Sequence, residues 1–292
     1  RLIGEGKALD STTHFLICSN VLGGCQGTTG PSTVAVDGKP YGSRFPAVTV
    51  GDFVTVQERL LDHLGVGSLA MVAGGSMGGM QALEWASRFP DRVERVWVTA
   101  SALAHGAMQI GFNEVARQSI LRDPKWRGGD YPPDDPPAHG LSVGRMAGHL
   151  TYLSDAAFTA KFGREVQQDE KGAPLPEWPK FLQRQAFSVE SYLRYQGDKF
   201  VQRFDPNSLL ILSNAIDTYQ ADLSRAKARF LVTSFTSDWI YPSHLSQAIH
   251  EASLAAGCES HWVDIDLPLG HDAFLLDDVH QAALVRDFLN RP

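Results

Sequence analysis

The sequence predicts an α/β protein with a mostly parallel, doubly wound sheet, and three observations support this. Short apolar runs rich in β-branched residues end at Gly, Asp or Ser, as buried parallel strands do. Stretches with helical periodicity separate these runs, so strand and helix alternate along the chain. One long segment between two of the strands breaks this alternation and indicates an inserted helical cap.

The expected elements follow in chain order. The runs expected to be strands are residues 14–19, 68–74, 93–99, 230–235 and 261–265. The stretches expected to be helices beside the sheet are residues 55–64, 78–88 and 279–289. Residues 104–225 are the expected cap, which is Pro-rich at 131–137 and has helical patterns at 143–153 and 209–222. The core is then residues 1–103 together with 226–292.

Composition excludes several classes of protein. No apolar run among the 292 residues approaches the ~20 residues that a membrane-spanning helix needs. A net charge of -7 argues against a general nucleic-acid or anionic-membrane surface. Cys18, Cys25 and Cys258 have no paired spacing, and the ten histidines are scattered, so we expect no disulfide framework, no metal site and no tightly held cofactor. A reducing cytoplasm fits this cysteine usage.

The strongest motif is G-G-S-M-G at residues 74–78, which matches G-x-S-x-G between an expected strand and an expected helix. In that context the motif predicts a nucleophile elbow with Ser76 exposed at the end of the strand. The amide of Met77 would then stabilise an oxyanion, an interaction worth ~3 to 4 kcal/mol. The alternatives are a tightly packed turn or a phosphate cradle, although neither the Rossmann nor the P-loop pattern is present.

A serine nucleophile needs a histidine base and a carboxylate that orients it. In the α/β-hydrolase fold these follow in the order Ser, Asp or Glu, His. His271 lies in a G-H-D loop after the last expected strand, and Asp238 follows the strand that begins near residue 230. A surface turn and a helix cap are the alternatives for these two positions. We therefore predict an α/β-hydrolase fold with the triad Ser76, Asp238 and His271.

Longer motifs resemble a known family. They are NVLGGC at 20–25, GTTGP at 27–31, GGSMGGMQALEW at 74–85, SDW at 237–239 and GHDAF at 270–274. Together they resemble the homoserine O-acetyltransferases, and the likeness runs along nearly the whole chain. The resemblance implies ping-pong transfer of an acetyl group from acetyl-CoA through Ser76 to L-homoserine, in methionine biosynthesis. It also implies a homodimer assembled through the cap, with coenzyme A as a carrier only.

The resemblance further assigns residues that contact substrate. Arg145 matches the family arginine that holds the substrate carboxylate, and Asp272 matches the carboxylate that meets the substrate ammonium. A solvated helix arginine and an acidic loop residue are the alternatives. Succinyl-CoA users tend to carry an arginine two positions after the triad aspartate, where this chain has Ile240. An apolar residue at this acyl-specificity position favours a short neutral acyl group.

Members of the family begin with a further segment that supplies the first strands and a loop whose amide completes the oxyanion hole. This chain starts after that segment, so we expect the family's N-terminal strands to be missing and the activity of these 292 residues to be impaired.

Three other functions remain open at this stage. Homoserine or serine O-succinyl transfer would use the same machinery, and one methylene provides only ~1 to 3 kcal/mol of discrimination. A serine esterase would share the fold and the triad. A noncatalytic binding protein would retain the fold alone, although the intact Ser76, Asp238 and His271 argue against it.

Overall fold

The protein is described by a computed structural model that covers residues 2–166, 187–277 and 279–291. Within these residues a four-stranded sheet has the order β1-β2-β3-β4 and is parallel throughout. The strands are β1 (Val72–Gly75), β2 (Arg95–Thr99), β3 (Arg229–Phe235) and β4 (Ser260–Ile265). This confirms the predicted parallel α/β class. Because the strands are parallel, their carboxyl ends all meet at one edge of the sheet.

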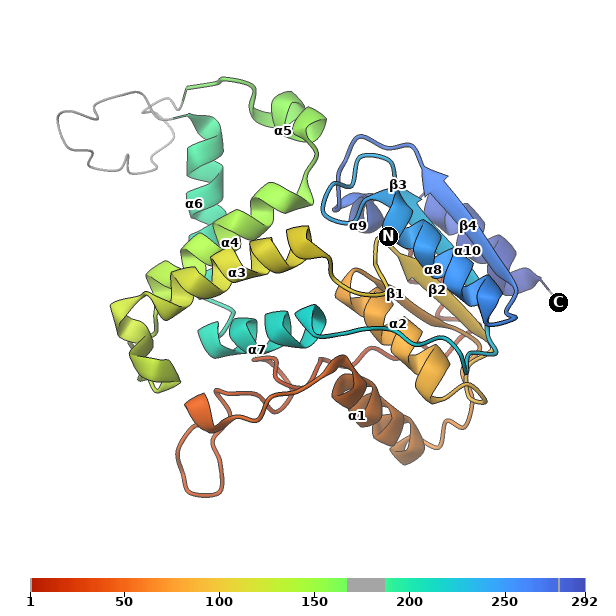
Figure 1. Ribbon diagram of the computed structural model, residues 1–292, viewed down its shortest axis with the longest axis horizontal. Coiled ribbons are helices and arrows are strands. Elements are labelled where there is room, and N and C mark those ends of the chain that lie inside the picture. Colours follow the sequence, from red (N-terminus) through yellow and green to blue (C-terminus); the bar gives the residue numbers. More distant parts are fainter. Residues whose placement is uncertain (1, 167–186, 278, 292) are drawn as a thin grey trace.

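Helices cover both faces of the sheet (Figure 1). Val96 and Val98 of β2 pack in one apolar cluster, while Trp97 between them packs in another on the opposite face. Successive side chains of a strand point to opposite faces, so this alternation follows from the pleat. The helices beside the sheet are α1 (Val50–His63), α2 (Met77–Arg88), α8 (Ser243–Ala255) and α10 (His280–Asn290). The sheet is therefore doubly wound, as predicted.

Three of these helices lie where the sequence predicts them, with shifted ends. Helix α1 begins five residues before the expected start, because Thr49 and Asp52 form a capping box. The Thr49 side chain accepts from the Asp52 amide, and the Asp52 carboxylate accepts from the Thr49 amide. Reciprocal bonds of this kind satisfy two amides that the first turn leaves unpaired. Helix α8 is not among the helices predicted from the sequence.

The prediction of a strand at residues 14–19 is wrong. These residues have no strand structure, and Phe15 is 76% exposed. An apolar run becomes a strand only where a neighbouring backbone offers hydrogen bonds, and no described strand lies beside this one. The expected strand at 68–74 is also shortened, since Leu69 forms only an isolated bridge with Val93 before β1 begins at Val72.

Between β2 and β3 the chain builds a helical layer that lies to one side of the sheet (Figure 1). Its elements are α3 (Ala107–Leu121), the 3-10 helix η2 (Pro124–Gly129), α4 (Ala138–Tyr152), α5 (Asp155–Phe162), α6 (Ser188–Val201) and α7 (Pro206–Asp217). Helices α3, α4 and α6 pack closely around Ile120, Leu141 and Phe200. Close packing requires Gly140, where a Cβ would lie 2.4 Å from the carbonyl oxygen of Ser119. Helix α7 ends at Asp217, earlier than expected.

Two short elements complete the described chain, the 3-10 helix η1 (Gly42–Arg44) and the helix α9 (Ala273–Leu276). No helix in the described ranges is both long enough and apolar enough to cross a membrane.

Candidate active site

Ser76 lies at a strained turn between β1 and α2. Its backbone has φ 54° and ψ -123°, in the region that non-glycine residues rarely adopt. The turn is held because the Ser76 amide donates to the carbonyl oxygens of Thr99 at 3.0 Å and Ala100 at 3.2 Å. It is also tight, since a Cβ on Gly74 would lie 2.1 Å from the carbonyl oxygen of Gly78. Strain of this kind, held by its surroundings, is typical of functional positions.

The amide of Met77 is placed where an oxyanion donor is needed. Met77 is the first residue of α2, directly after Ser76. Among the described residues its N–H has no hydrogen-bond acceptor, as is usual in the first turn of a helix. The helix N-terminus adds partial positive charge at the same place. Negative charge that develops beside Ser76 would therefore meet an unpaired donor.

The base and its acid form a buried pair. His271 Nδ1 lies 2.7 Å from Asp238 Oδ2, and the two residues are 4% and 3% exposed. The second carboxylate oxygen of Asp238 accepts from the amides of Ile240 at 3.1 Å and Tyr241 at 2.8 Å. With Nδ1–H committed to Asp238, Nε2 of His271 is left as the proton acceptor. The pair has the geometry that general-base catalysis needs.

The loop that carries His271 docks on the segment after α4. Gly270 has φ +72°, and a Cβ there would lie 2.4 Å from the amide nitrogen of Ser154. The Ser154 hydroxyl donates to the carbonyl oxygen of Pro268 at 2.5 Å, and the Gly270 amide donates to the Ser237 hydroxyl at 2.9 Å. The position of His271 therefore depends on both the sheet and the helical layer.

Arg145 and Asp272, far apart in the sequence, meet at Tyr152. Arg145 Nη1 donates to the Tyr152 hydroxyl at 3.3 Å, and the Asp272 amide donates to the Tyr152 carbonyl oxygen at 2.9 Å. The Tyr152 ring lies 6.2 Å from the imidazole of His271 between ring centres. No ion pair of Arg145 is recorded with a described residue, and its Nε is buried without a partner. Arg145 and Asp272 are thus both hydrogen-bonded to the residue whose ring lies beside His271.

Burial shifts the titration of two groups at this place. It raises the pKa of Asp272, while the nearby His271 and Arg145 act in the opposite direction. Burial, together with the positive charge of Arg145, also lowers the pKa of His149 to about 4. His149 is therefore neutral at physiological pH, and its Nε2 is buried without a partner. The positive charge here comes from Arg145 rather than from His149.

Ile240 lies directly beside the aspartate of the pair. Its side chain is 7% exposed and belongs to an apolar cluster with Met80 and Tyr241. Its carbonyl oxygen accepts from the Gln109 side chain of α3. The position is apolar, and backbone hydrogen bonds fix it.

Sequence reasoning missed Tyr152, Tyr241 and His105 as neighbours of the site. Tyr152 follows Arg145 by seven residues, two turns along one helix face, and that spacing could have indicated it. Tyr241 stacks on His271 with ring centres 5.1 Å apart, and His105 contacts Tyr241. No local pattern signals these last two contacts, because Tyr241 lies 136 positions from His105 and 30 positions from His271.

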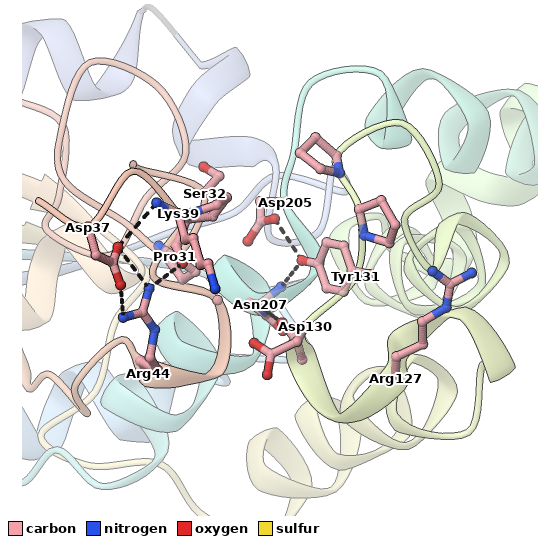
Figure 2. Close-up of a pocket in the computed structure, with 15 residues that line it drawn as sticks. Pro31, Ser32, Asp37, Lys39, Arg44, Arg127, Asp130, Tyr131, Asp205 and Asn207 are labelled. Carbon is pink, nitrogen blue, oxygen red and sulfur yellow. Dashed lines mark hydrogen bonds and ion pairs between the residues drawn. The ribbon is translucent and has the colours of Figure 1, made fainter. Parts of the chain in front are cut away.

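A separate cavity lies away from these residues. The cavity has a volume of about 710 Å³ and lies between the segment 31–44 and the loop 127–133 (Figure 2), and none of the predicted site residues lines it. On one side the Tyr131 hydroxyl donates to Asp205 at 2.7 Å and accepts from the Asn207 amide at 3.1 Å. On the other, Arg44 pairs with Asp37 at 2.7 Å. Asp130 accepts from the Ser43 hydroxyl at 2.9 Å, and Arg127 pairs with Asp135 outside the cavity lining at 2.7 Å.

A metal centre is not indicated in the part of the chain that the structure describes, where no three His, Cys, Asp or Glu side chains are grouped to hold an ion. The candidate site instead contains the strained Ser76 and the buried His271–Asp238 pair.

Comparison with known proteins agrees with this geometry. A family model described as the alpha/beta hydrolase fold matches residues 3–278. A homoserine O-acetyltransferase of Solidesulfovibrio magneticus is 47% identical over 302 residues, which cover 99% of this chain and 75% of that protein. The crystal structure of a homoserine O-acetyltransferase from Bacillus anthracis superposes with a TM-score of 0.88 at 25% identity, covering 99% of this chain and 80% of the other. Esterase E22 gives the same TM-score at 31% identity, with 99% and 81% covered.

Proposed function

The chain belongs to the homoserine O-acetyltransferase family of the α/β-hydrolase fold, and we propose that it moves an acetyl group from acetyl-CoA to the hydroxyl of L-homoserine through an acetyl-Ser76 intermediate. This places it in methionine biosynthesis. The observation that carries the proposal is the buried His271–Asp238 pair at 2.7 Å, at the same sheet edge as the strained Ser76. Two substrates and one acyl-enzyme make the reaction ping-pong.

In the first half-reaction His271 Nε2 takes the proton of the Ser76 hydroxyl as Oγ attacks the thioester carbonyl carbon. The carbonyl oxygen becomes negative and accepts from the Met77 amide. When the tetrahedral intermediate collapses, the carbon–sulfur bond breaks and His271 returns its proton to the departing thiolate. Coenzyme A leaves as the free thiol, and the acetyl group remains on Ser76.

In the second half-reaction the acceptor hydroxyl takes the place of the thiol. His271 removes its proton, the alkoxide oxygen attacks the acetyl ester, and Ser76 regains a proton as its ester bond breaks. Water can do the same chemistry, so a transferase must hold its acceptor in place and limit access of water. We assign residues 104–225 as the cap that does this over the core formed by 1–103 and 226–292.

The acceptor is an amino acid in this proposal. The guanidinium of Arg145 suits a carboxylate, which it can engage with two parallel hydrogen bonds. The Asp272 carboxylate suits the ammonium group. Both lie at Tyr152 beside His271, which supports a bound amino acid with its side-chain hydroxyl near the base. The 47% identical relative is named for homoserine, and serine is the shorter alternative.

The donor is acetyl-CoA in this proposal, supported by the buried apolar side chain of Ile240 next to Asp238. A succinyl group would carry a carboxylate toward this apolar side chain without a cation from position 240. A cytoplasmic location, which the cysteine usage favours, and a homodimer formed through the cap, which the family resemblance implies, complete the proposal.

The test combines purified protein with L-homoserine and either acetyl-CoA or succinyl-CoA and follows release of free thiol. Thiol release that requires homoserine and acetyl-CoA, and that Ser76→Ala abolishes, is the expected result. Release at the same rate without homoserine would instead support the esterase alternative, which the structural likeness to esterase E22 makes worth measuring. A preference for succinyl-CoA would overturn the donor assignment, and a faster reaction with L-serine would overturn the acceptor.

A further inference from the structure

Gln281, the second residue of α10, is a completely buried polar side chain that the triad chemistry does not use. Its Nε2 donates to two backbone carbonyl oxygens, that of Phe274 at 3.1 Å and that of Asp277 at 2.9 Å. Its Oε1 accepts from the Thr99 hydroxyl at 3.3 Å. A buried amide is costly unless its donors and its acceptor are met, and here all of them are used.

The partners of the Gln281 amide determine which way it points. Carbonyl oxygens only accept, so the amide nitrogen must face Phe274 and Asp277. The amide oxygen then faces Thr99, whose hydroxyl is the donor. The backbone amide of Gln281 also donates to Asp277 Oδ2 at 3.1 Å, which fixes the start of the side chain. Gln281 therefore has one defined arrangement, held from both ends.

Thr99 connects Gln281 to the turn that carries Ser76. It is the last residue of β2, and its carbonyl oxygen accepts from the Ser76 amide at 3.0 Å. Its methyl group lies against Gly75, where a Cβ would be 3.0 Å from Thr99 Cγ2. The residue whose hydroxyl meets Gln281 is thus the residue that holds the strained turn.

Phe274 connects Gln281 to the loop that carries His271. Its amide donates to the His271 carbonyl oxygen at 3.4 Å, and its ring meets the imidazole edge to face, with ring centres 5.2 Å apart. The same ring lies against Gly75, where a Cβ would be 2.6 Å from two ring carbons. Phe274 therefore contacts both the base and the residue before the nucleophile.

We propose that Gln281 is a positioning residue, which sets the place of His271 relative to Ser76 by joining the Phe274 carbonyl to the Thr99 hydroxyl. Proton transfer requires the two side chains within hydrogen-bond reach, so a small shift of either segment lowers the rate. Gln281 acts only through Phe274 and Thr99. The inference rests on Ser76 as the proposed nucleophile, and it does not depend on which acyl donor or acceptor is used.

The test is the rate at which a fluorophosphonate probe labels Ser76, measured on the full chain. Thr99→Val keeps a β-branched side chain and removes only the bond to Gln281, and it is expected to lower the rate constant of labelling about fivefold. Gln281→Met is unbranched and similar in length but removes all three bonds of the amide, and the expected loss is at least about tenfold. The same losses are expected in kcat of acyl transfer.

Thr233→Val is the matched control, because Thr233 is the register partner of Thr99 on the neighbouring strand β3. Thr233 is completely buried, and its hydroxyl accepts from Trp97 Nε1 at 3.1 Å. The control is expected to lower the melting temperature about as much as Thr99→Val does and to label at the unaltered rate. A role of Thr99 in stability alone would leave both variants with the unaltered labelling rate.

Two further variants test whether Thr99 and Gln281 act together. Thr99→Ser keeps the hydroxyl and is expected to recover most of the labelling rate that Thr99→Val loses. In the Gln281→Met background, Thr99→Val is expected to cause no further loss, because the bond it removes is already absent. Independent losses that multiply in the double variant would contradict the proposed connection.

The outcomes are distinguishable from failure of the proposed function. If the unaltered chain is not labelled at Ser76, the nucleophile assignment fails, and this inference fails with it. If the unaltered chain is labelled and Thr99→Val and Gln281→Met label equally fast, only the role of Gln281 is overturned. Melting temperatures show whether each variant is folded, and Thr99→Val remains decisive should Gln281→Met not fold.

Discussion

The indole Nε1–H of Trp239 donates to the backbone carbonyl oxygen of Leu153 at 3.1 Å. This bond ties the residue after the triad aspartate to the end of α4, which carries Arg145 and Tyr152. The Trp239 ring also meets Phe112 of α3 edge to face, with ring centres 5.3 Å apart. The proposed acceptor site and the triad are therefore held together by contacts between the core and the helical layer.

Trp239→Phe tests that connection. The variant keeps an aromatic ring against Phe112 and loses the hydrogen bond, so we expect a loss of about 1 kcal/mol in the free energy of unfolding. We also expect KM for homoserine to rise several-fold, because the end of α4 is less firmly placed. Trp262→Phe removes a comparable bond, from Nε1 to the Ser234 hydroxyl at 2.9 Å, in the sheet. An equal rise in KM in both variants would show that the effect is not specific to α4.

Gly270→Ala tests the docking of the His271 loop. Alanine must adopt φ +72° and also push its Cβ against the backbone of Ser154, so we expect a loss of about 2 to 4 kcal/mol in stability and most of the activity. Gly257→Ala has a similar φ of +83° with no atom within 4 Å of its Cβ, and it is expected to lose only about 1 kcal/mol and no activity. Urea denaturation and thiol release measure both quantities. Equal losses in the two variants would contradict the close approach to Ser154.

Arg145→Lys tests the carboxylate site. Lysine keeps the charge and loses the planar fork, so we expect KM for homoserine to rise at least about tenfold. Labelling of Ser76 by a fluorophosphonate should stay at the unaltered rate, because Arg145 takes no part in forming the acyl-enzyme. Arg122→Lys, at the exposed end of α3, serves as the control. A slower labelling rate with an unchanged KM would remove Arg145 from the acceptor site.

The lowered pKa of His149 predicts that the stability of the protein depends on pH. Its folded pKa of about 4 lies below the ordinary value of 6.5, so the unfolded chain binds the proton more readily between these values. Stability contributed by the neutral ring is therefore present above pH 6.5 and is lost as pH falls toward 4. We expect a loss of about 1 to 2 kcal/mol from this group, reduced from the full shift by partial access of solvent. His149→Gln should flatten the dependence, and the exposed His63→Gln should not. Parallel curves for His149→Gln and the unaltered chain would contradict this assignment.

The fold could be predicted to the extent that local patterns determine it. The runs that became β2 and β3 are apolar and β-branched, and their burial on two faces leaves a clear signal. The run at 14–19 has the same signal, but a strand also requires a hydrogen-bonding neighbour, which a single segment cannot reveal. The paired Asp238 and His271 could be predicted because both follow strands whose ends meet at one edge.

The rest of the site depends on packing that periodicity does not encode. Tyr152 reaches His271 only because the segment after α4 docks on Gly270, and Tyr241 reaches His105 only because the helical layer lies beside β3. These contacts join residues more than 100 positions apart and depend on side-chain shape at several helix crossings. Sequence alone therefore predicted the His271–Asp238 pair and missed the groups that hold it.

The positive φ of Ser76 makes stability and the proposed function favour different residues at this position. Glycine adopts φ 54° without strain, so Ser76→Gly is expected to gain about 1 kcal/mol in stability while losing the proposed nucleophilic hydroxyl. A library of variants screened only for resistance to heat would accordingly enrich glycine at residue 76 and lose the proposed nucleophile. Thermal screening of this protein therefore needs an activity measurement beside it, because the proposed nucleophile has a strained backbone.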